Sequence, residues 1–313
     1  MLAFFLRRIL ATVPVLIIVA LIVFFMLRLA PGDPAAAIVG NSGTAHDIAM
    51  VRASLGLDDS MPVQFVRWVG QLVQGNLGES FFMKIPVSKL IAQRIEPTLS
   101  LAALTLVLAV MISVPLGVLA AWRHGGWLDR TLMGFSVLGF SIPAFVLGYI
   151  LIWLFSLHLQ WLPVQGYSRL ENGILPWLRH LVLPSIALSI IYVALIARVT
   201  RAAVAEAMTE DYIRTARAKG ISEARVLIRH GLANAAVPIV TVIGIGIALL
   251  IGGVVVTETV FAIPGLGQLT VDAVLSRDFP LIQGIILFFS VIYVFINLLV
   301  DLSYLVLDPR IRY

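Results

Sequence analysis

Six long apolar stretches constrain this chain more than any other feature of its sequence. They lie at about residues 9–30, 98–121, 132–157, 181–200, 237–257 and 282–307. About 20 mostly apolar residues cross a bilayer as an α-helix, the form that satisfies its own backbone hydrogen bonds in lipid. The chain is 60% hydrophobic and 12% charged, whereas a soluble domain carries roughly 25% charged residues. The sequence therefore predicts an all-α, polytopic membrane protein with six transmembrane helices.

Proline occurs within several of these stretches. Pro14, Pro115 and Pro143 interrupt the first three, and Pro184 lies near the start of the fourth. Transmembrane helices tolerate proline where neighbouring helices satisfy the freed backbone groups. We therefore expect the spans to continue through these residues.

The positions of Lys and Arg predict the orientation of the spans. With an inner N-terminus, the inner segments contain 13 of the 22 basic residues: Arg7, Arg8, Arg123, Arg130, Arg198, Arg201, Arg214, Arg217, Lys219, Arg225, Arg229, Arg310 and Arg312. These segments total roughly 60 residues against roughly 110 outside, so the density of basic residues follows the positive-inside rule. We expect both termini in the cytoplasm. The net charge of +5 then reflects orientation and not nucleic-acid binding.

The first apolar stretch can also be read as a signal peptide, with Arg7 and Arg8 as its basic start. Its roughly 22 apolar residues exceed the 7–15 of a signal peptide, so we expect an uncleaved span. The outer segment that follows, 31–97, contains a predicted turn at Pro31-Gly32-Asp33-Pro34 and two amphipathic helix candidates at 47–57 and 63–73. These helices are expected to lie on the membrane or to pack on the bundle.

The inner segment at about 201–236 has the most specific pattern in the chain. It begins with Glu210 and Asp211, continues into basic residues, and reaches Gly220, which fits the left-handed position that ends a helix. Ser222 and Glu223 then suit the start of a second helix running towards Pro238. The pattern predicts helix, glycine stop, helix. The first helix could dock into a partner's groove, enforce topology as a basic loop, or pack on its own bundle.

Several motifs resemble a known family. Ala216 and Gly220 have the Ala-x-x-x-Gly spacing of the "EAA" loop of bacterial ABC importer permeases, although Arg214-Thr215 stands where that loop has Glu-Ala. The whole run 211–220 is similar to the version in the dipeptide/oligopeptide/nickel/glutathione permeases. Four further stretches match the first-type subunit of that family, in order along the chain: Pro31-Gly32-Asp33-Pro34, Gly75-Asn76-Leu77-Gly78-Glu79-Ser80, Phe261-Ala262-Ile263-Pro264-Gly265-Leu266-Gly267 and Asp308-Pro309-Arg310-Ile311-Arg312-Tyr313.

The resemblance implies a type I ABC importer transmembrane domain in a bacterial inner membrane. In such importers the first loop helix docks into a cytoplasmic ATPase, whose closure drives the spans between inward-open and outward-open states. It implies a coupling role for Tyr212, Ile213, Arg214, Ala216, Arg217, Ala218, Lys219 and Gly220. It also implies three kinds of protein partner: a homologous second permease, two ATPase subunits or domains, and an extracytoplasmic substrate-binding protein.

The implied organisation has three parts. Residues 1–97 would hold the first span and the long outer segment, 98–307 the five-helix transmembrane domain with its coupling loop, and 308–313 a cytoplasmic tail. The outer segment would receive the binding protein, gate the exit, or only pack on the bundle. The cargo is left open among dipeptides, oligopeptides, glutathione, nickel chelates and sugars, and no translocation-path residue is assigned.

The chain itself has no motif for ATP hydrolysis or metal binding. A P-loop lysine follows a glycine, and none of Lys84, Lys89 and Lys219 does. The five histidines (His46, His124, His158, His180, His230) lack metal-ligand spacing, and the absence of cysteine excludes disulfides and thiol catalysis. We expect no catalytic residue, no metal and no cofactor on this chain, with ATP bound by partner subunits.

Ionisable residues in the predicted spans raise an alternative hypothesis for the function. Asn297 and Asp301 share one face of the sixth span, and Glu258 ends the fifth. A proton-coupled secondary transporter or channel would use such groups as a relay. In the structural reading, Glu258 lies near the outer end of its span and Asp301 near the inner end, where it can meet a basic partner. A scaffold without a mobile partner is the third possibility.

Overall fold

A computed structural model describes residues 2–29, 34–39, 44–54 and 56–307. Within these ranges the regular structure is helical, apart from one isolated antiparallel bridge between Glu79 and Pro86. The elements are α1 (Leu2–Leu29), α2 (Pro34–Val39), α3 (Ala45–Ser54), α4 (Met61–Val73), α5 (Val87–Trp122), α6 (Trp127–Ser141), α7 (Ala144–Leu151), η1 (Ile152–His158), η2 (Leu170–Asn172), α8 (Ile174–Ala207), α9 (Asp211–Ala218), α10 (Glu223–Arg225), η3 (Val226–Leu232), α11 (Ala236–Val260), α12 (Leu266–Leu275) and α13 (Phe279–Leu307). The predicted all-α class is confirmed.

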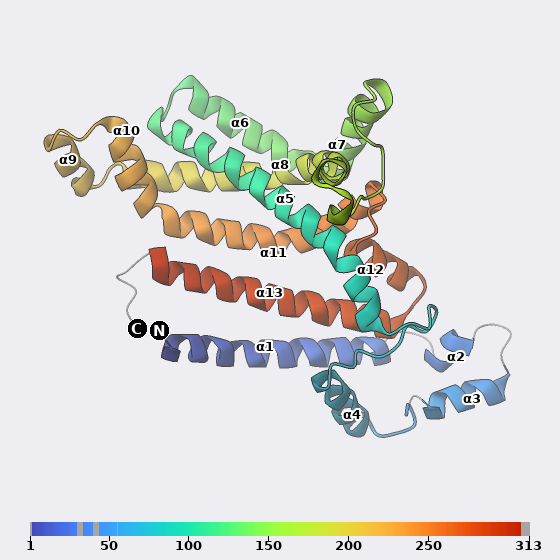
Figure 1. The fold of residues 1–313 in the computed structure, drawn as a ribbon. Coiled ribbons are helices and arrows are strands. Elements are labelled where there is room, and N and C mark those ends of the chain that lie inside the picture. The colour runs from blue at the N-terminus through green and yellow to red at the C-terminus, as the bar shows by residue number, and fades with distance from the viewer. Residues whose placement is uncertain (1, 30–33, 40–43, 55, 308–313) are drawn as a thin grey trace. The chain divides into compact units, whose positions relative to one another are not determined.

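The chain forms two compact units. The colour in Figure 1 follows the residue number from the N-terminus to the C-terminus. One unit comprises residues 1–96 and 268–294, and the other comprises 97–267 and 295–313. The second unit holds α6 to α11 and the inner segment singled out above.

Four helices of the described chain are long and apolar enough to cross a membrane. They are α5, α8, α11 and residues Phe279–Tyr304 of α13. The pair formed by α6 and the helix after it is a fifth candidate. Residues Leu10–Met26 form a shorter apolar stretch within α1. The multi-spanning character is confirmed, whereas six as the number of spans stays a prediction.

The expected span at 132–157 is not one helix. Its two halves are bent by 96° at the break between Ser141 and Ala144. Pro143 has no backbone N–H and disfavours helical backbone in the residue before it, and Ile142 has an extended ψ of 117°. Pro184, in contrast, lies inside α8, which begins seven residues before the expected 181. The expectation that the chain continues as a helix through proline is therefore correct for Pro184 and wrong for Pro143.

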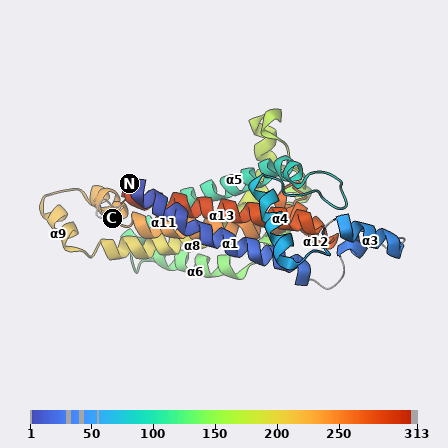
Figure 2. The same ribbon diagram turned by 90° about the horizontal axis from the view of Figure 1, so that it is seen from below.

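Helix α8 is the most buried of the apolar helices and packs against α6, α7 and α11 (Figures 1 and 2). Three neighbouring helices each present glycine to it. A Cβ on Gly117 of α5 would lie 2.7 Å from the Ala197 carbonyl oxygen, one on Gly139 of α6 3.1 Å from Ala194 Cβ, and one on Gly253 of α11 2.8 Å from Leu188 Cδ1. Small residues allow such close approach between helices in a membrane. These contacts make α8 the centre of its unit.

The outer segment contains a helix at each of the two expected places, α3 and α4. Helix α4 is amphipathic as expected, whereas α3 does not separate apolar and polar residues onto two faces. On α4, Phe65 and Trp68 pack around Phe24 of α1, with ring centroids 5.1 Å and 5.6 Å from the Phe24 ring. Burial of aromatic rings in such edge-on and tilted arrangements stabilises the contact. Packing on α1, one of the two expected positions, is therefore the observed one for α4. The predicted turn at 31–34 lies mostly outside the described residues.

Candidate functional site

The inner segment folds as helix, glycine stop and helix, as its sequence predicts. Helix α9 ends in a Schellman motif: Gly220 N–H donates to the Arg217 carbonyl at 2.9 Å, and Ile221 N–H donates to the Ala216 carbonyl at 3.3 Å. Gly220 has a φ of 75°, and no atom lies within 4 Å of where its Cβ would be. Glycine is thus required here for its backbone conformation, since there is room for a side chain.

Two of the eight predicted coupling residues face inward. Ile213 is fully buried and Ala216 nearly so, in a cluster with Val226 that Met208 and Ile221 complete. Within this chain the two residues attach α9 to η3, and the coupling role predicted for them stays a prediction. An apolar pair at i and i+3 in an otherwise polar helix is the sequence signal for this inward face.

The other predicted residues form an exposed face, which we call the α9 face. It consists of Tyr212, Arg214, Arg217, Ala218, Lys219 and Gly220. The Tyr212 side chain is 39% exposed, and partial burial followed by the nearby Glu210 carboxylate raises the pKa of its hydroxyl. The phenol therefore stays a neutral hydrogen-bonding group. Such a ring on a basic surface is suited to anchoring in a partner's groove.

A side-chain pair closes the turn after α9. Arg217 Nε donates to Glu223 Oε1 at 2.8 Å, and Arg217 Nη2 donates to Oε2 at 3.1 Å. Hydrogen bonding to Arg217 lowers the pKa of the Glu223 carboxyl, and the carboxylate raises the pKa of Arg217. Both side chains are solvent-exposed, so the pair contributes modestly to stability. Its geometry fixes the start of α10 relative to α9.

A second, more buried pair fixes the end of α8. Arg201 Nε and Nη2 donate to the two oxygens of Asp129 at 2.9 Å and 2.7 Å, and Gly125 N–H donates to the same carboxylate at 2.9 Å. Asp129 is 3% exposed. Bidentate geometry makes this one of the stronger kinds of ion pair. It attaches α6 to α8 six residues before α8 ends, and no sequence motif identified it.

Glu258 has a structural environment. Its side chain is fully buried and accepts a hydrogen bond of 2.6 Å from Thr98 Oγ1, which itself accepts one of 2.7 Å from Leu266 N–H. A Cβ at Gly265 would overlap the Glu258 carboxylate, which explains why the 261–267 motif has glycine at position 265. The structural reading of Glu258 is thus supported. Asp301 is half-buried and Asn297 exposed on α13, and their part in transport stays a hypothesis.

The Gly75–Ser80 motif contacts Asp278 within the unit formed by residues 1–96 and 268–294. Ser80 Oγ donates to the carboxylate of Asp278, which also accepts weaker hydrogen bonds from the Phe81 and Leu281 amides. Asp278 directly precedes α13 and acts as its N-terminal cap. Sequence reasoning missed Asp278, although an aspartate before Phe-Pro at a helix start is a recognisable signal.

Over the part of the chain that the structure describes, no group of His, Asp or Glu residues is arranged to hold a metal ion. The closing motif at 308–313 lies outside that part.

Comparisons with known proteins agree with this architecture. The profile of the family described as "Binding-protein-dependent transport system inner membrane component" matches residues 113–313, and that of its N-terminal region matches residues 1–102. A "probable peptide ABC transporter permease protein" of Sinorhizobium fredii is 53% identical over 310 residues, covering 99% of both chains. A glutathione transport system permease protein of Salmonella paratyphi A is 44% identical over 313 residues, covering 100% of both.

The fold is also similar to a solved one. A chain of the MetNI methionine ABC transporter, from a crystal form described as inward-facing, superposes with a TM-score of 0.59 at 19% identity. The match covers 71% of this chain and 97% of that chain. Together with the full-length relatives, these findings confirm the family that the motifs predicted. The chain belongs to the binding-protein-dependent transport system inner membrane components, the multi-pass permease subunits of ABC importers in the inner membrane.

Proposed function

We propose that this permease forms half of the pathway of a peptide importer and receives the energy of ATP through the α9 face. The observation that carries the proposal is the division of α9: Ile213 and Ala216 hold the helix to η3, while Tyr212 and its basic neighbours are left exposed. Because α9 is packed against η3 on one face, a partner that binds the exposed face and moves α9 would also move η3. The full-length relatives named for peptide and glutathione transport support the cargo class.

The chemistry of ATP hydrolysis is assigned to other subunits. The chain has no P-loop, so ATP would bind to two ATPase subunits or domains, and this chain would need no cofactor. A homologous second permease would complete the pathway, and an extracytoplasmic binding protein would deliver the substrate. Family membership implies an ATPase and a binding protein in general; this particular composition is our proposal.

The coupling would run from α9 to the spans by way of two connections. One is the hydrophobic cluster of Ile213, Ala216 and Val226, which joins α9 to η3 and so to α11. The other is the short link from α9 back to α8, whose end Arg201 and Asp129 attach to α6. Movement of α9 would therefore reach α6, α8 and α11 together.

Orientation and organisation follow from the same proposal. The α9 segment would face the cytoplasm, with both termini on that side. Residues 1–97 would form the first span and outer segment, and 98–307 the transmembrane domain. The six-span count belongs to this proposal.

The decisive experiment is reconstitution of this chain with its second permease, its ATPases and its binding protein into vesicles. Uptake of a labelled dipeptide and of glutathione should require ATP and the binding protein together. Variants D301N and E258Q should be compared for ATP-independent uptake by the chain alone. Transport by the chain alone, driven by a pH gradient and abolished in D301N, would support the proton-coupled alternative instead.

A further inference from the structure

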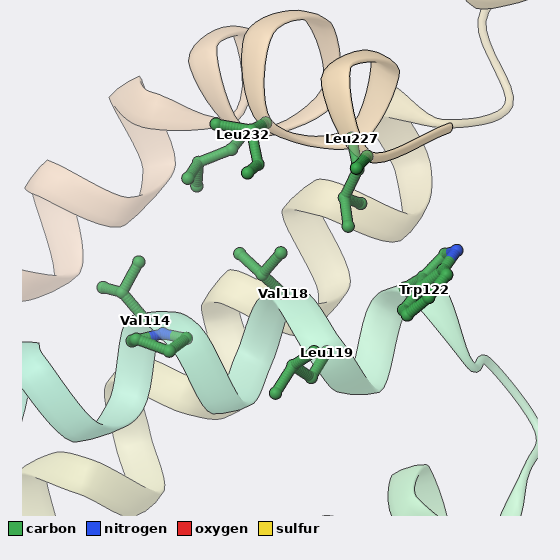
Figure 3. Close-up of a pocket in the computed structure, with 9 residues that line it drawn as sticks. Val114, Val118, Leu119, Trp122, Leu227 and Leu232 are labelled. Atoms are coloured by element: carbon green, nitrogen blue, oxygen red, sulfur yellow. The ribbon is translucent and has the colours of Figure 1, made fainter. Parts of the chain in front are cut away.

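An apolar groove lies between the end of α5 and the segment α10–η3. It has a volume of about 450 Å³ and is lined by Val114, Pro115, Val118, Leu119, Trp122, Ala224, Leu227, Ile228 and Leu232. Figure 3 shows Leu227 and Leu232 directed from η3 towards Val118 and Val114 of α5. No charged side chain lines the groove, so its contents must be apolar. We call this site the α5–η3 groove.

The groove has a buried floor and an open mouth. Val118 and Leu227 belong to a hydrophobic cluster that reaches Val204 of α8. At the mouth, Trp122 is 50% exposed and Ile228 is 61% exposed. A site of this shape admits a narrow apolar group from the side.

Three arginines each directly follow, in the sequence, a residue that lines the groove. Arg123 follows Trp122 and lies over its ring, with 5.6 Å from the guanidinium carbon to the ring centroid. Arg225 follows Ala224, and Arg229 follows Ile228; both are exposed, and neither is in an ion pair within the described ranges. A wholly apolar groove beside three arginines is complementary to one molecule that carries a hydrocarbon chain and an anionic head.

We propose that the α5–η3 groove binds an anionic phospholipid, with one acyl chain between α5 and η3 and the phosphate at Arg123, Arg225 and Arg229. Basic residues beside a membrane surface attract anionic headgroups, and basic pockets between transmembrane helices select them. The inference rests on the orientation given in the proposed function, which puts these arginines at the inner leaflet. A lipid here would contact η3, the segment that anchors α9.

Tryptophan quenching tests the proposal. The full chain, assembled with its partner subunits, is reconstituted into phosphatidylcholine vesicles with rising fractions of either phosphatidylglycerol or phosphatidylcholine carrying dibrominated acyl chains. Bromine quenches indole fluorescence on contact. The complex has several tryptophans, six of them in this chain, so the signal of Trp122 is obtained by subtracting that of W122F.

Quenching of Trp122 by brominated phosphatidylglycerol should saturate, at a half-maximal fraction about tenfold below that of brominated phosphatidylcholine. The double variant R225Q/R229Q should bring the two lipids within about twofold of each other, whereas R198Q, at an exposed arginine of α8 outside the groove, should leave the preference intact. Ala224→Phe, which fills the groove, should remove the saturable component. Ala233→Phe, at an exposed site directly after η3 and outside the groove, should not.

Equal quenching by the two lipids would overturn the proposal. So would quenching of Trp122 in the isolated chain that disappears on assembly, since a protein subunit would then occupy the groove. The readout needs neither ATP nor cargo and samples both leaflets. Failure of lipid binding is therefore distinguishable from failure of transport or of the assigned orientation.

Discussion

Arg217 and Glu223 form a bidentate salt bridge across the turn at Gly220, so side chains as well as backbone connect α9 to α10. The backbone part is the Schellman motif, in which Ile221 also packs against the cluster that contains Ala216. The salt bridge, the backbone hydrogen bonds and the packing of Ile221 together hold the turn in one conformation, so α9 has a defined direction relative to η3. That direction decides which residues of α9 a partner can contact.

The salt bridge makes the turn sensitive to acid. The pKa of Glu223 in the folded protein lies below its ordinary value of 4.5, so the contribution of the pair is complete above about pH 4.5 and is lost as the pH falls through the lowered pKa. The chain has no cysteine, so Ser222→Cys offers a single site for a spin label. Its mobility should rise below pH 4.5. In the E223Q background mobility should be independent of pH, and a persistent acid transition there would contradict the assignment.

Replacing Gly220 by valine should uncouple ATP hydrolysis from uptake. A left-handed φ costs a β-branched residue about 1–2 kcal/mol, which corresponds to roughly a 5- to 30-fold loss of the correctly directed α9. ATP-driven uptake should fall by that factor while membrane insertion persists. G220N should retain most of the uptake, because asparagine tolerates this conformation. G75V, with the same φ sign and equally free space at an outer turn, is the matched control. Wild-type uptake by G220V would disprove the coupling role.

Tyr212 and Ile213 are neighbours with opposite predicted phenotypes. Tyr212→Ala should weaken ATPase binding by roughly 30-fold, as loss of an interface anchor worth about 2 kcal/mol does, and leave stability unchanged. Ile213→Ala should destabilise the α9–η3 contact by about 2–4 kcal/mol through the cavity it leaves. Co-purification and thermal unfolding measure the two effects. An unstable Y212A or a fully stable I213A would reverse the assignment of faces.

Replacing Arg201 alone should lower the free energy of unfolding more than replacing Asp129 and Arg201 together. Arg201→Gln leaves a buried carboxylate uncompensated, at about 2–3 kcal/mol, somewhat less than for a fully buried pair. Arg201 keeps 23% of its side chain exposed, which is the reason for the smaller cost. The double variant D129N/R201Q should lie closer to the wild type. Unfolding in dodecyl sulfate measures each variant. Additive losses would show that the two residues do not act as a pair.

Gly265→Ala should destabilise the loop that encloses Glu258. The added methyl group would overlap the Glu258 carboxylate, and overpacking of this kind costs about 1–3 kcal/mol. Gly252→Ala in α11 is the matched control, because no atom lies within 4 Å of its Cβ position. It should be neutral or slightly stabilising. Equal unfolding temperatures for the two variants would contradict the packing described for Glu258.

Local signals predicted the helix, the glycine stop and the second helix of the inner segment. The acidic start, the basic end and Gly220 are all within ten residues, and each acts through the backbone of its own helix. Which face of α9 is buried depends on Val226 and Met208, which belong to other elements. The sequence of α9 alone therefore does not show which neighbours Ile213 and Ala216 contact.

Long-range features could not be predicted in the same way. Asp129 and Arg201 are 72 residues apart, and no spacing rule connects them. Pro143 breaks a helix whereas Pro184 does not. The difference depends on whether neighbouring helices satisfy the backbone around each proline, which is a property of the packed bundle.

The length of α8 has a mechanical consequence. Its 34 residues extend about 51 Å, well beyond a hydrocarbon core of about 30 Å. Helix α8 therefore extends beyond the bilayer, with η2 preceding it at one end and α9 following it at the other. In the proposed orientation, a binding protein would displace the outer end of α8, and an ATPase would displace its inner end through α9. Both partners would therefore move the same helix. Each would then influence the affinity of the other by the same factor.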